Sequence, residues 1–333
     1  MNNMSKSAKT VLKIFSGTVP CDVSELDLGI TLKGGQSFRW KEIPENKYRG
    51  VFASSIWTLH QDSSQIFFTV HTSSLKSSKA CKEQLEKYFR LDLSLRDNLI
   101  VWCSSDPKFS RFSSQVRGVR ILDQNPTENL FSFICSANNH ITRITKMIER
   151  MCENYGRKIG EVDGENYFDF PKIEDLSQEE VPQVLAKEGF GYRAKYIGNS
   201  AKKLMELGGI EFLESLHRYS GISYDDARKK LMVLPGVGPK VADCICLMSL
   251  GHLEAIPVDT HIYQVAKETY LPGLKKFSTS SGVYGEINRF FRDTWGSLAG
   301  WAQAIVFCSR IKSQERTGED LEAQGPVKKT RKK

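Results

Sequence analysis

Two residues that could do covalent chemistry stand at the starts of consecutive helical segments. Lys240 follows Pro-Gly-Val-Gly-Pro at 235–239 and lies in the first turn of an apolar helix. The positive end of a helix disfavours a cation, so the local field favours the neutral, nucleophilic amine. Nineteen residues later, Asp259 stands at the N-terminal end of another helix, predicted over 262–270. Across one cleft, the amine could attack a sugar C1′ while the carboxylate stabilises the developing positive charge.

The segment before Lys240 joins two predicted helices by a Gly-x-Gly turn. Gly236 and Gly238 permit positive φ, and they carry no side chain that would hold a partner away from the backbone. Free N–H groups at the start of the second helix then form an anion site suited to a DNA phosphate. Plainer interpretations remain open: an ordinary turn, a surface lysine with a solvated amine, and an aspartate that only caps its helix.

The overall composition is that of a globular protein. A chain of 333 residues with 40% hydrophobic and 26% charged residues predicts about two domains and excludes global disorder. The most apolar run, 241–250, contains an aspartate and is shorter than the ~18 apolar residues of a membrane span. The chain also begins without a signal-peptide segment. We therefore expect an intracellular protein with no membrane partner.

The eight cysteines carry no pattern typical of a metal site. No Cys-x-x-Cys pair occurs, and no four cysteines have zinc or iron–sulfur spacing. Several lie in apolar runs, as at 135, 244 and 246. The pattern predicts free buried thiols in a reducing compartment, with no metal and no cofactor.

The net charge of +8 belongs to the two ends of the chain. Lysines and arginines number 47 against 39 acidic residues. Five of the basic residues lie at 328–333 and three at 6, 9 and 13, so the remainder of the chain is neutral. A neutral body is expected to hold DNA through a local set of groups rather than through a uniformly basic surface.

The elements that must position these groups fall into two parts. Short β-branched and aromatic segments predict an antiparallel sheet with strands at 36–41, 48–53, 55–61 and 66–72. From Asn125-Pro126, a helix N-cap followed by proline, the chain reads as helical. Ser177…Glu180 and Ser223…Asp226 resemble capping boxes of two further helices. The predicted fold class is α+β. It divides into a flexible N-terminus (1–22), an antiparallel-sheet domain with helices (23–120), a larger all-α domain (121–314) and a basic disordered tail (315–333).

Several motifs resemble one protein family. Leu-Pro-Gly-Val-Gly-Pro-Lys at 234–240, followed by Pro-Val-Asp-Thr-His at 257–261, is similar to the signature of helix-hairpin-helix DNA glycosylases with lyase activity. Other segments narrow the resemblance to the eukaryotic 8-oxoguanine DNA glycosylases. They are Gly-Gln-Ser-Phe-Arg-Trp (35–40), Phe-Ser-Phe-Ile-Cys-Ser (131–136), Gly-Tyr-Arg-Ala (191–194), Val-Ala-Asp-Cys-Ile-Cys-Leu-Met (241–248) and Gly-Trp-Ala-Gln-Ala (300–304). The matches run in order from about residue 25 to 310.

The resemblance implies roles for the two catalytic candidates and for a base pocket. Lys240 would form a Schiff base with the deoxyribose, and Asp259 would be the essential carboxylate. Gly35 would accept a hydrogen bond from the N7–H of 8-oxoguanine, which guanine lacks. Cys244 would lie against the base and form a charge dipole with the lysine. The other substrate-binding residues are Phe307, which would stack on the base, Gln303, which would bind its Watson–Crick edge, and Met248 and Pro257 in the pocket.

The resemblance also implies a set of DNA-binding residues. Asn138, Arg143 and Arg193 would hold the orphaned cytosine, and Tyr192 would wedge into the base stack. His261 would contact a phosphate, and Gly236 and Gly238 belong to the hairpin. Two positions depart from the family: His140 stands where a third asparagine is usual, and Pro239 precedes the lysine.

The implied function is a base-excision-repair DNA glycosylase and abasic-site lyase acting on 8-oxoguanine opposite cytosine. Its partner would be double-stranded DNA containing that pair, with downstream base-excision-repair enzymes as further candidates, and a monomer is expected. The basic tail predicts a nuclear location, and the cationic first 21 residues favour a mitochondrial route as well. Two alternatives are a related glycosylase for another oxidised base and a non-enzymatic DNA-binding hairpin protein. An iron–sulfur loop like that of many endonuclease III-like enzymes is excluded, because one cysteine alone lies beyond residue 246.

Overall fold

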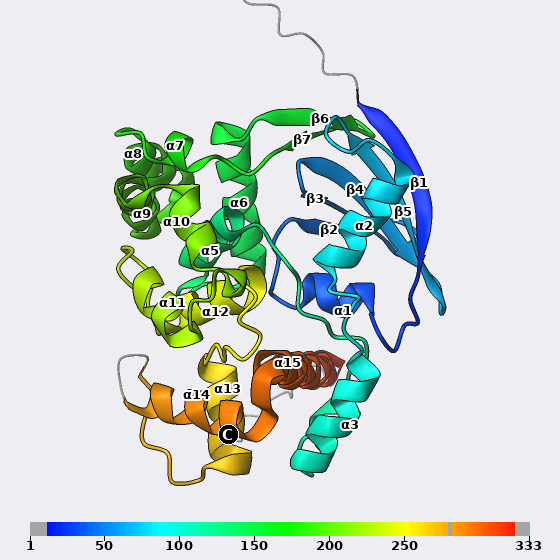
Figure 1. Cartoon of the computed structure of the whole chain (residues 1–333), viewed down its shortest axis with the longest axis vertical. Coiled ribbons are helices and arrows are strands. Elements are labelled where there is room, and N and C mark those ends of the chain that lie inside the picture. Colours follow the sequence, from blue (N-terminus) through cyan, green and yellow to red (C-terminus); the bar gives the residue numbers. More distant parts are fainter. Residues whose placement is uncertain (1–11, 279–281, 324–333) are drawn as a thin grey trace, which may run out of the picture.

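The computed structural model describes residues 12–278 and 282–323, and it contains one five-stranded antiparallel sheet beside a helical body (Figure 1). The strand order is β1-β5-β4-β3-β2. The strands are β1 (Lys13–Pro20), β2 (Trp40–Ile43), β3 (Lys47–Phe52), β4 (Ser55–Gln61) and β5 (Gln65–Thr72). The helices in this half are α1 (Leu28–Lys33), α2 (Ser78–Tyr88), α3 (Leu95–Ser105) and α4 (Ser110–Ser113).

The helical body begins at the predicted N-cap. The Asn125 side chain accepts from the amides of Thr127 and Glu128, with Pro126 as the first helical residue. The helices here are α5 (Pro126–Ser136), α6 (Ile141–Tyr155), α7 (Ile173–Leu176), α8 (Val181–Leu185), α9 (Arg193–Leu207), α10 (Ile210–Ser215), α11 (Tyr224–Leu231), α12 (Pro239–Ser249), α13 (Thr260–Val265), α14 (Gly282–Trp295) and α15 (Ala299–Ala323). A hairpin of β6 (Lys158–Val162) and β7 (Glu165–Phe168) interrupts them. The predicted α+β class with a helical second part is therefore confirmed.

The predicted flexible segment 1–22 contains a strand. β1 pairs antiparallel with β5, from Lys13 opposite Thr72 to Pro20 opposite Gln65. Its inward positions alternate, but one of them is Gly17, which conceals the two-residue period in the sequence. A Cβ on Gly17 would lie 2.7 Å from the Phe68 ring, so a larger residue would have to displace that ring.

Two predicted boundaries in the helical part also shift. Ser177 does not begin a helix; it ends α7, and its hydroxyl donates to the carbonyl of Glu174. The Ser223 cap is confirmed, because its Oγ accepts from the Asp226 amide. α15 continues to Ala323, past the predicted start of the tail at 315. The basic cluster at 328–333, on which the predicted nuclear location rests, lies outside the described residues. So do residues 1–11 of the 21 on which the mitochondrial prediction rests.

The two halves share their cores across the predicted boundary at residue 120. α3 belongs to the core of the helical body: the Trp102 indole N–H donates to the carbonyl of Trp295, and its ring meets Trp301 edge-on. In the other direction, the β6–β7 hairpin reaches over the sheet (Figure 1) and packs Ile159 against Ile56. The sheet and the helices are therefore held in a fixed relation by exchanged elements.

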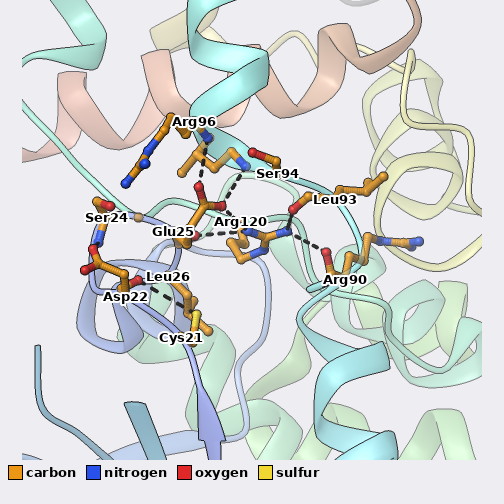
Figure 2. Close-up of polar contacts among 12 residues, drawn as sticks. Cys21, Asp22, Ser24, Glu25, Leu26, Arg90, Leu93, Ser94, Arg96 and Arg120 are labelled. Carbon is orange, nitrogen blue, oxygen red and sulfur yellow. Dashed lines mark hydrogen bonds and ion pairs between the residues drawn. The ribbon is translucent and has the colours of Figure 1, made fainter. Parts of the chain in front are cut away.

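A buried arginine fixes the junction between the halves. Arg120 is 1% exposed. Its Nε donates to the carbonyl of Phe89, and its two terminal nitrogens donate to the carbonyls of Arg90 and Leu93 and to Glu25 (Figure 2). The Glu25 carboxylate also accepts from two amides in the first turn of α3. Burial of this cation is tolerated because its donors are satisfied.

Arg120 also contacts α15 and the turn after α1. The Arg120 guanidinium lies 4.8 Å from the centre of the Trp301 ring on α15. Its backbone carbonyl accepts from the Gln36 side chain at 2.6 Å, and the Gln36 carbonyl oxygen Oε1 accepts from the Leu122 amide. Arg120 thus connects α15 to residues 34–36, two segments that meet again in the site below.

We expect Arg120→Met to destabilise the protein strongly. The change keeps similar bulk but leaves several buried carbonyl groups and the Glu25 carboxylate without their donor, which costs about 3–5 kcal/mol. Urea unfolding should report the loss. Arg96→Met, at an exposed position of α3, is the control and should change stability by less than about 0.5 kcal/mol. Equal midpoints for the two variants would contradict this role of Arg120.

No helix of residues 12–278 and 282–323 is long and apolar enough to cross a membrane. All eight cysteines are free, and seven are buried. Within the same residues, no cluster of three or more His, Cys, Asp and Glu side chains could hold a metal ion.

Candidate active site

The turn between α11 and α12 places Lys240 at a helix start. Gly236 has φ +82°, and a Cβ on it would lie 2.8 Å from Tyr196, so this position requires glycine. Gly238 is the N-cap of α12 and offers no side-chain cap to the first amides of that helix. Pro239 is the first helical residue, where proline is tolerated because that N–H has no partner within the helix. The departure at 239 therefore leaves the helix start intact.

Lys240 is half-buried and faces the end of α5. Its Nζ donates to the Ser136 hydroxyl at 3.3 Å and lies 4.8 Å from the centre of the Phe133 ring. One turn later in α12, Cys244 is buried beside it. Burial raises the pKa of the Cys244 thiol to about 11, although the Lys240 charge opposes the shift. The thiol therefore lies close enough to Lys240 for the amine charge to act on it, as the predicted charge dipole requires.

Asp259 caps the helix that follows. Its Oδ1 accepts from the Ile262 amide at 2.9 Å as the N-cap of α13, and the helix continues through one wider turn, Ala266–Tyr270. The capping interpretation is therefore confirmed, yet the carboxylate is half-buried and lines the same pocket as Lys240. Capping holds the carboxylate in a fixed position and does not exclude a chemical role.

One pocket, with about 450 Å³ of space partly open to solvent, gathers both catalytic candidates and all six predicted substrate-binding residues. Its walls come from the turn after α1, from α5, from α12, from the segment before α13 and from α15. The predicted members are Gly35, Lys240, Cys244, Met248, Pro257, Asp259, Gln303 and Phe307; Gly34, Gln36, Phe133, Ala304 and Cys308 complete the lining.

The turn after α1 delivers Gly35 to the pocket. The predicted strand at 36–41 starts only at Trp40, because residues 34–38 turn away from the sheet to reach the helices. Gly35 has φ +74°, a conformation that glycine adopts without strain. A Cβ on it would lie 3.7 Å from the Ile141 Cδ1 and 3.8 Å from the Phe307 Cε1. Gly35 therefore lies between α6 and α15 at the rim of the pocket.

Asp243 is a buried carboxylate to which the motifs assign no role, and its hydrogen bonds support the pocket. Asp243 accepts from the hydroxyls of Tyr224 and Tyr284 and from Nε of Arg228, at 2.5–2.7 Å. Burial raises the pKa of Asp243 to about 6, against the opposing effect of Arg228. The Tyr284 hydroxyl also accepts from the Val258 amide, next to Asp259. The network links the helix of Lys240 to the segment of Asp259, so these residues position both groups.

The predicted residues for the orphaned base lie together at the turn between α5 and α6. Arg193 is buried; its Nε donates to the Ala137 carbonyl and its Nη2 to the carbonyls of Ala137 and Asn138. Tyr192 is 50% exposed, donates to the same Ala137 carbonyl and lies under the Arg193 guanidinium. Arg143 is exposed and donates to the Gly189 carbonyl. Arg193 therefore holds this turn, with two of its donor nitrogens already engaged by the backbone.

The remaining predicted DNA contacts border the same face. The ring of Tyr192 meets that of Tyr196, which packs against Gly236 of the hairpin. His261, on α13, places its ring edge-on against Phe307, which lines the pocket of Lys240 and Asp259. His140 replaces the usual asparagine and serves as the N-cap of α6, its Nδ1 accepting from the Arg143 amide at 3.4 Å.

Both halves of the chain match known family models. Residues 18–130 match the N-terminal domain of 8-oxoguanine DNA glycosylase, and residues 131–284 match the HhH-GPD superfamily of base excision DNA repair proteins. An N-glycosylase/DNA lyase OGG1 from Arabidopsis thaliana is 36% identical, covering 88% of this chain and 79% of the relative. An N-glycosylase/DNA lyase from Saccharomyces cerevisiae is 38% identical, covering 89% and 86%.

The three-dimensional arrangement is also shared. The crystal structure of the Clostridium acetobutylicum 8-oxoguanine glycosylase/lyase in complex with double-stranded DNA containing cytosine opposite 8-oxoguanine superposes with a TM-score of 0.78. The two sequences are 26% identical, and the match covers 91% of this chain and 98% of that one. The overall fold is thus common to both proteins along nearly their whole length.

Proposed function

The chain belongs to the 8-oxoguanine DNA N-glycosylase/lyase family, and on that premise we propose that it removes 8-oxoguanine paired with cytosine and then cuts the abasic strand through a Schiff base on Lys240. The observation that carries this proposal is the pocket itself. A half-buried amine, a fixed carboxylate and the lining for a planar base occupy one cavity. The related Clostridium enzyme has been crystallised on this base pair.

The first chemical step would replace the base by the lysine. The Lys240 amine, in its neutral form, forms a bond to C1′ as the C1′–N9 bond breaks. The departing base takes the electron pair, and the secondary ammonium formed at Nζ supplies the proton that the base takes up. Positive charge develops on the sugar, and the Asp259 carboxylate stabilises it in a site partly closed to water. Opening of the sugar ring then gives an iminium linkage between C1′ and Nζ.

The second step would cut the strand. Loss of a proton from C2′ of the iminium allows the 3′ phosphate to leave by β-elimination, and water then frees Lys240 from the sugar. A hydride donor such as borohydride reduces the iminium instead and leaves a stable secondary amine. The intermediate can therefore be captured as a covalent protein–DNA adduct.

Selection of the damaged base would rest on the pocket and not on the first encounter with DNA. The Gly35 carbonyl would meet an N–H donor in 8-oxoguanine and a lone pair in guanine. An unmet buried carbonyl costs about 1–3 kcal/mol, which favours the damaged base about 5- to 150-fold. Cytosine opposite the lesion would be held at the turn of Asn138 and Arg143, once the base has left the stack at a cost of a few kcal/mol.

Borohydride trapping on three duplexes tests the proposed function. The duplexes carry 8-oxoguanine opposite cytosine, 8-oxoguanine opposite adenine, or an undamaged guanine–cytosine pair. We expect a covalent adduct chiefly with the first duplex, and strand cleavage on that duplex when borohydride is omitted. Equal trapping on the undamaged duplex, or preference for the lesion opposite adenine, would refute the proposal.

A further inference from the structure

Ile141 is a large apolar side chain that remains 40% exposed beside the base pocket. It is the first residue of α6, and its Cδ1 lies 3.7 Å from the position that a Cβ on Gly35 would occupy. The same position lies 3.8 Å from Cε1 of Phe307. The δ-methyl group, the Gly35 backbone and the Phe307 ring therefore converge at the rim where a base would pass.

The segment that carries Ile141 also carries the residues placed on the opposite base. Asn138 precedes it with φ +48°, and Arg143 follows it in the same helical turn. The side-chain amide of Asn139 donates to the Cys135 carbonyl. His140 caps the helix, because its Nδ1 accepts from the backbone amide of Arg143. Together with the bonds from Arg193, these contacts tie residues 137–143 to one another, so a movement of the turn would carry Ile141 with it.

The branched side chain of isoleucine can transmit a movement of the α6 backbone to the pocket rim. A β-branched side chain in a helix has one strongly preferred χ1 rotamer, so the backbone of α6 fixes where its γ-carbons stand. A movement of the turn when Arg143 engages a base is therefore passed to the δ-methyl group at the pocket rim. Because 40% of Ile141 is exposed, it offers apolar surface at this point against which an inserted base can pack.

We propose that Ile141 is a specificity-determining positioning residue, which couples recognition of the opposite base by the α5–α6 turn to retention of the damaged base at the Gly35–Phe307 rim. The inference rests on the proposed excision of 8-oxoguanine opposite cytosine. With cytosine engaged, the side chain packs over the inserted base and slows its return to the duplex. With adenine opposite, the turn is not drawn into place and the base escapes before Lys240 reacts.

Ile141→Ala and Ile141→Val test the coupling, with Ile100→Ala as a control. Alanine preserves the helix, and valine keeps the branch but lacks the δ-methyl group. Ile100, 63% exposed on α3, is an apolar residue outside both the pocket and the turn. Single-turnover excision is measured opposite cytosine and opposite adenine, and strand cleavage is measured on a preformed abasic site opposite cytosine.

The ratio of the two excision rates is the decisive readout. In Ile141→Ala we expect excision opposite cytosine to fall about 10-fold and excision opposite adenine to stay unchanged, within the usual range of coupling between sites. Ile141→Val should fall between that variant and wild type. Cleavage of the abasic site should not change, because no base occupies the pocket.

An unchanged ratio in Ile141→Ala, or equal losses opposite both bases, would overturn the coupling. Failure of the proposed function would be seen in another arm of the experiment, because the wild-type protein would then show no preference for 8-oxoguanine opposite cytosine. The two failures are therefore distinguishable. The Ile100→Ala protein must match wild type in all three assays.

Discussion

Lys240→Gln will give no borohydride-trapped adduct on the duplex with 8-oxoguanine opposite cytosine, and excision will fall by at least about 10³-fold. Glutamine has similar length and can still bind the Ser136 hydroxyl that holds the lysine now. It lacks a nucleophilic amine, so no bond to C1′ can form. Gel electrophoresis of reduced reactions, together with single-turnover excision, measures both effects.

The control for this substitution is Lys82→Gln. Lys82 lies on α2 over the sheet and forms a long, exposed ion pair with Glu86 at 3.8 Å. Its replacement removes the same charge without touching the pocket, so trapping should equal that of wild type. A trapped adduct of normal yield in Lys240→Gln would mean that another amine is the nucleophile.

Asp259→Asn should bind the damaged duplex with affinity near that of wild type but excise the base about 10²- to 10³-fold more slowly. Asparagine is as good an N-cap as aspartate, so the bond from the Ile262 amide and the start of α13 should persist. What is lost is the negative charge beside C1′. Fluorescence anisotropy at fixed salt measures binding, and single-turnover kinetics measures excision.

Asp27→Asn supplies a matched change at a different helix start. Asp27 caps α1 by accepting from the Ile30 amide at 3.1 Å, and it does not line the base pocket. This variant should excise at nearly the wild-type rate. If Asp259→Asn also turned over at the wild-type rate, the carboxylate would have a capping role alone.

Local sequence signals predicted correctly that Lys240 and Asp259 stand at helix starts. The Gly-x-Gly turn and the proline after Gly238 indicate one helix start, and Asp259 indicates the next. A helix start depends on a few neighbouring residues, so local sequence is enough to predict it. The structure brings Lys240 and Asp259 to one pocket. The pocket residues at 35, 303 and 307 could be proposed only through the family resemblance, since no local rule joins segments so far apart in the chain.

The features that sequence reasoning missed depend on tertiary contacts. β1 needs Phe68 across from Gly17, and a glycine by itself argues against a strand. Asp243 lies in an apolar run and becomes a brace only because Tyr224 and Tyr284, from two other helices, point at it. In the sequence Ile141 is an ordinary helix residue, and only the structure shows that it lies beside Gly35 and Phe307. In each case the partner is distant in sequence.

The last long helix, α15, has a consequence for synthesis of the protein. It carries Gln303 and Phe307, whereas Gly35 on the facing wall is among the first residues made. A ribosome adding about 5–20 residues per second needs roughly 3–13 s to travel from Lys240 to Phe307. Throughout that interval the nascent chain already holds its reactive amine but has no ring to retain a base. Chains that end before residue 303 therefore lack the side chains of α15 that complete this pocket.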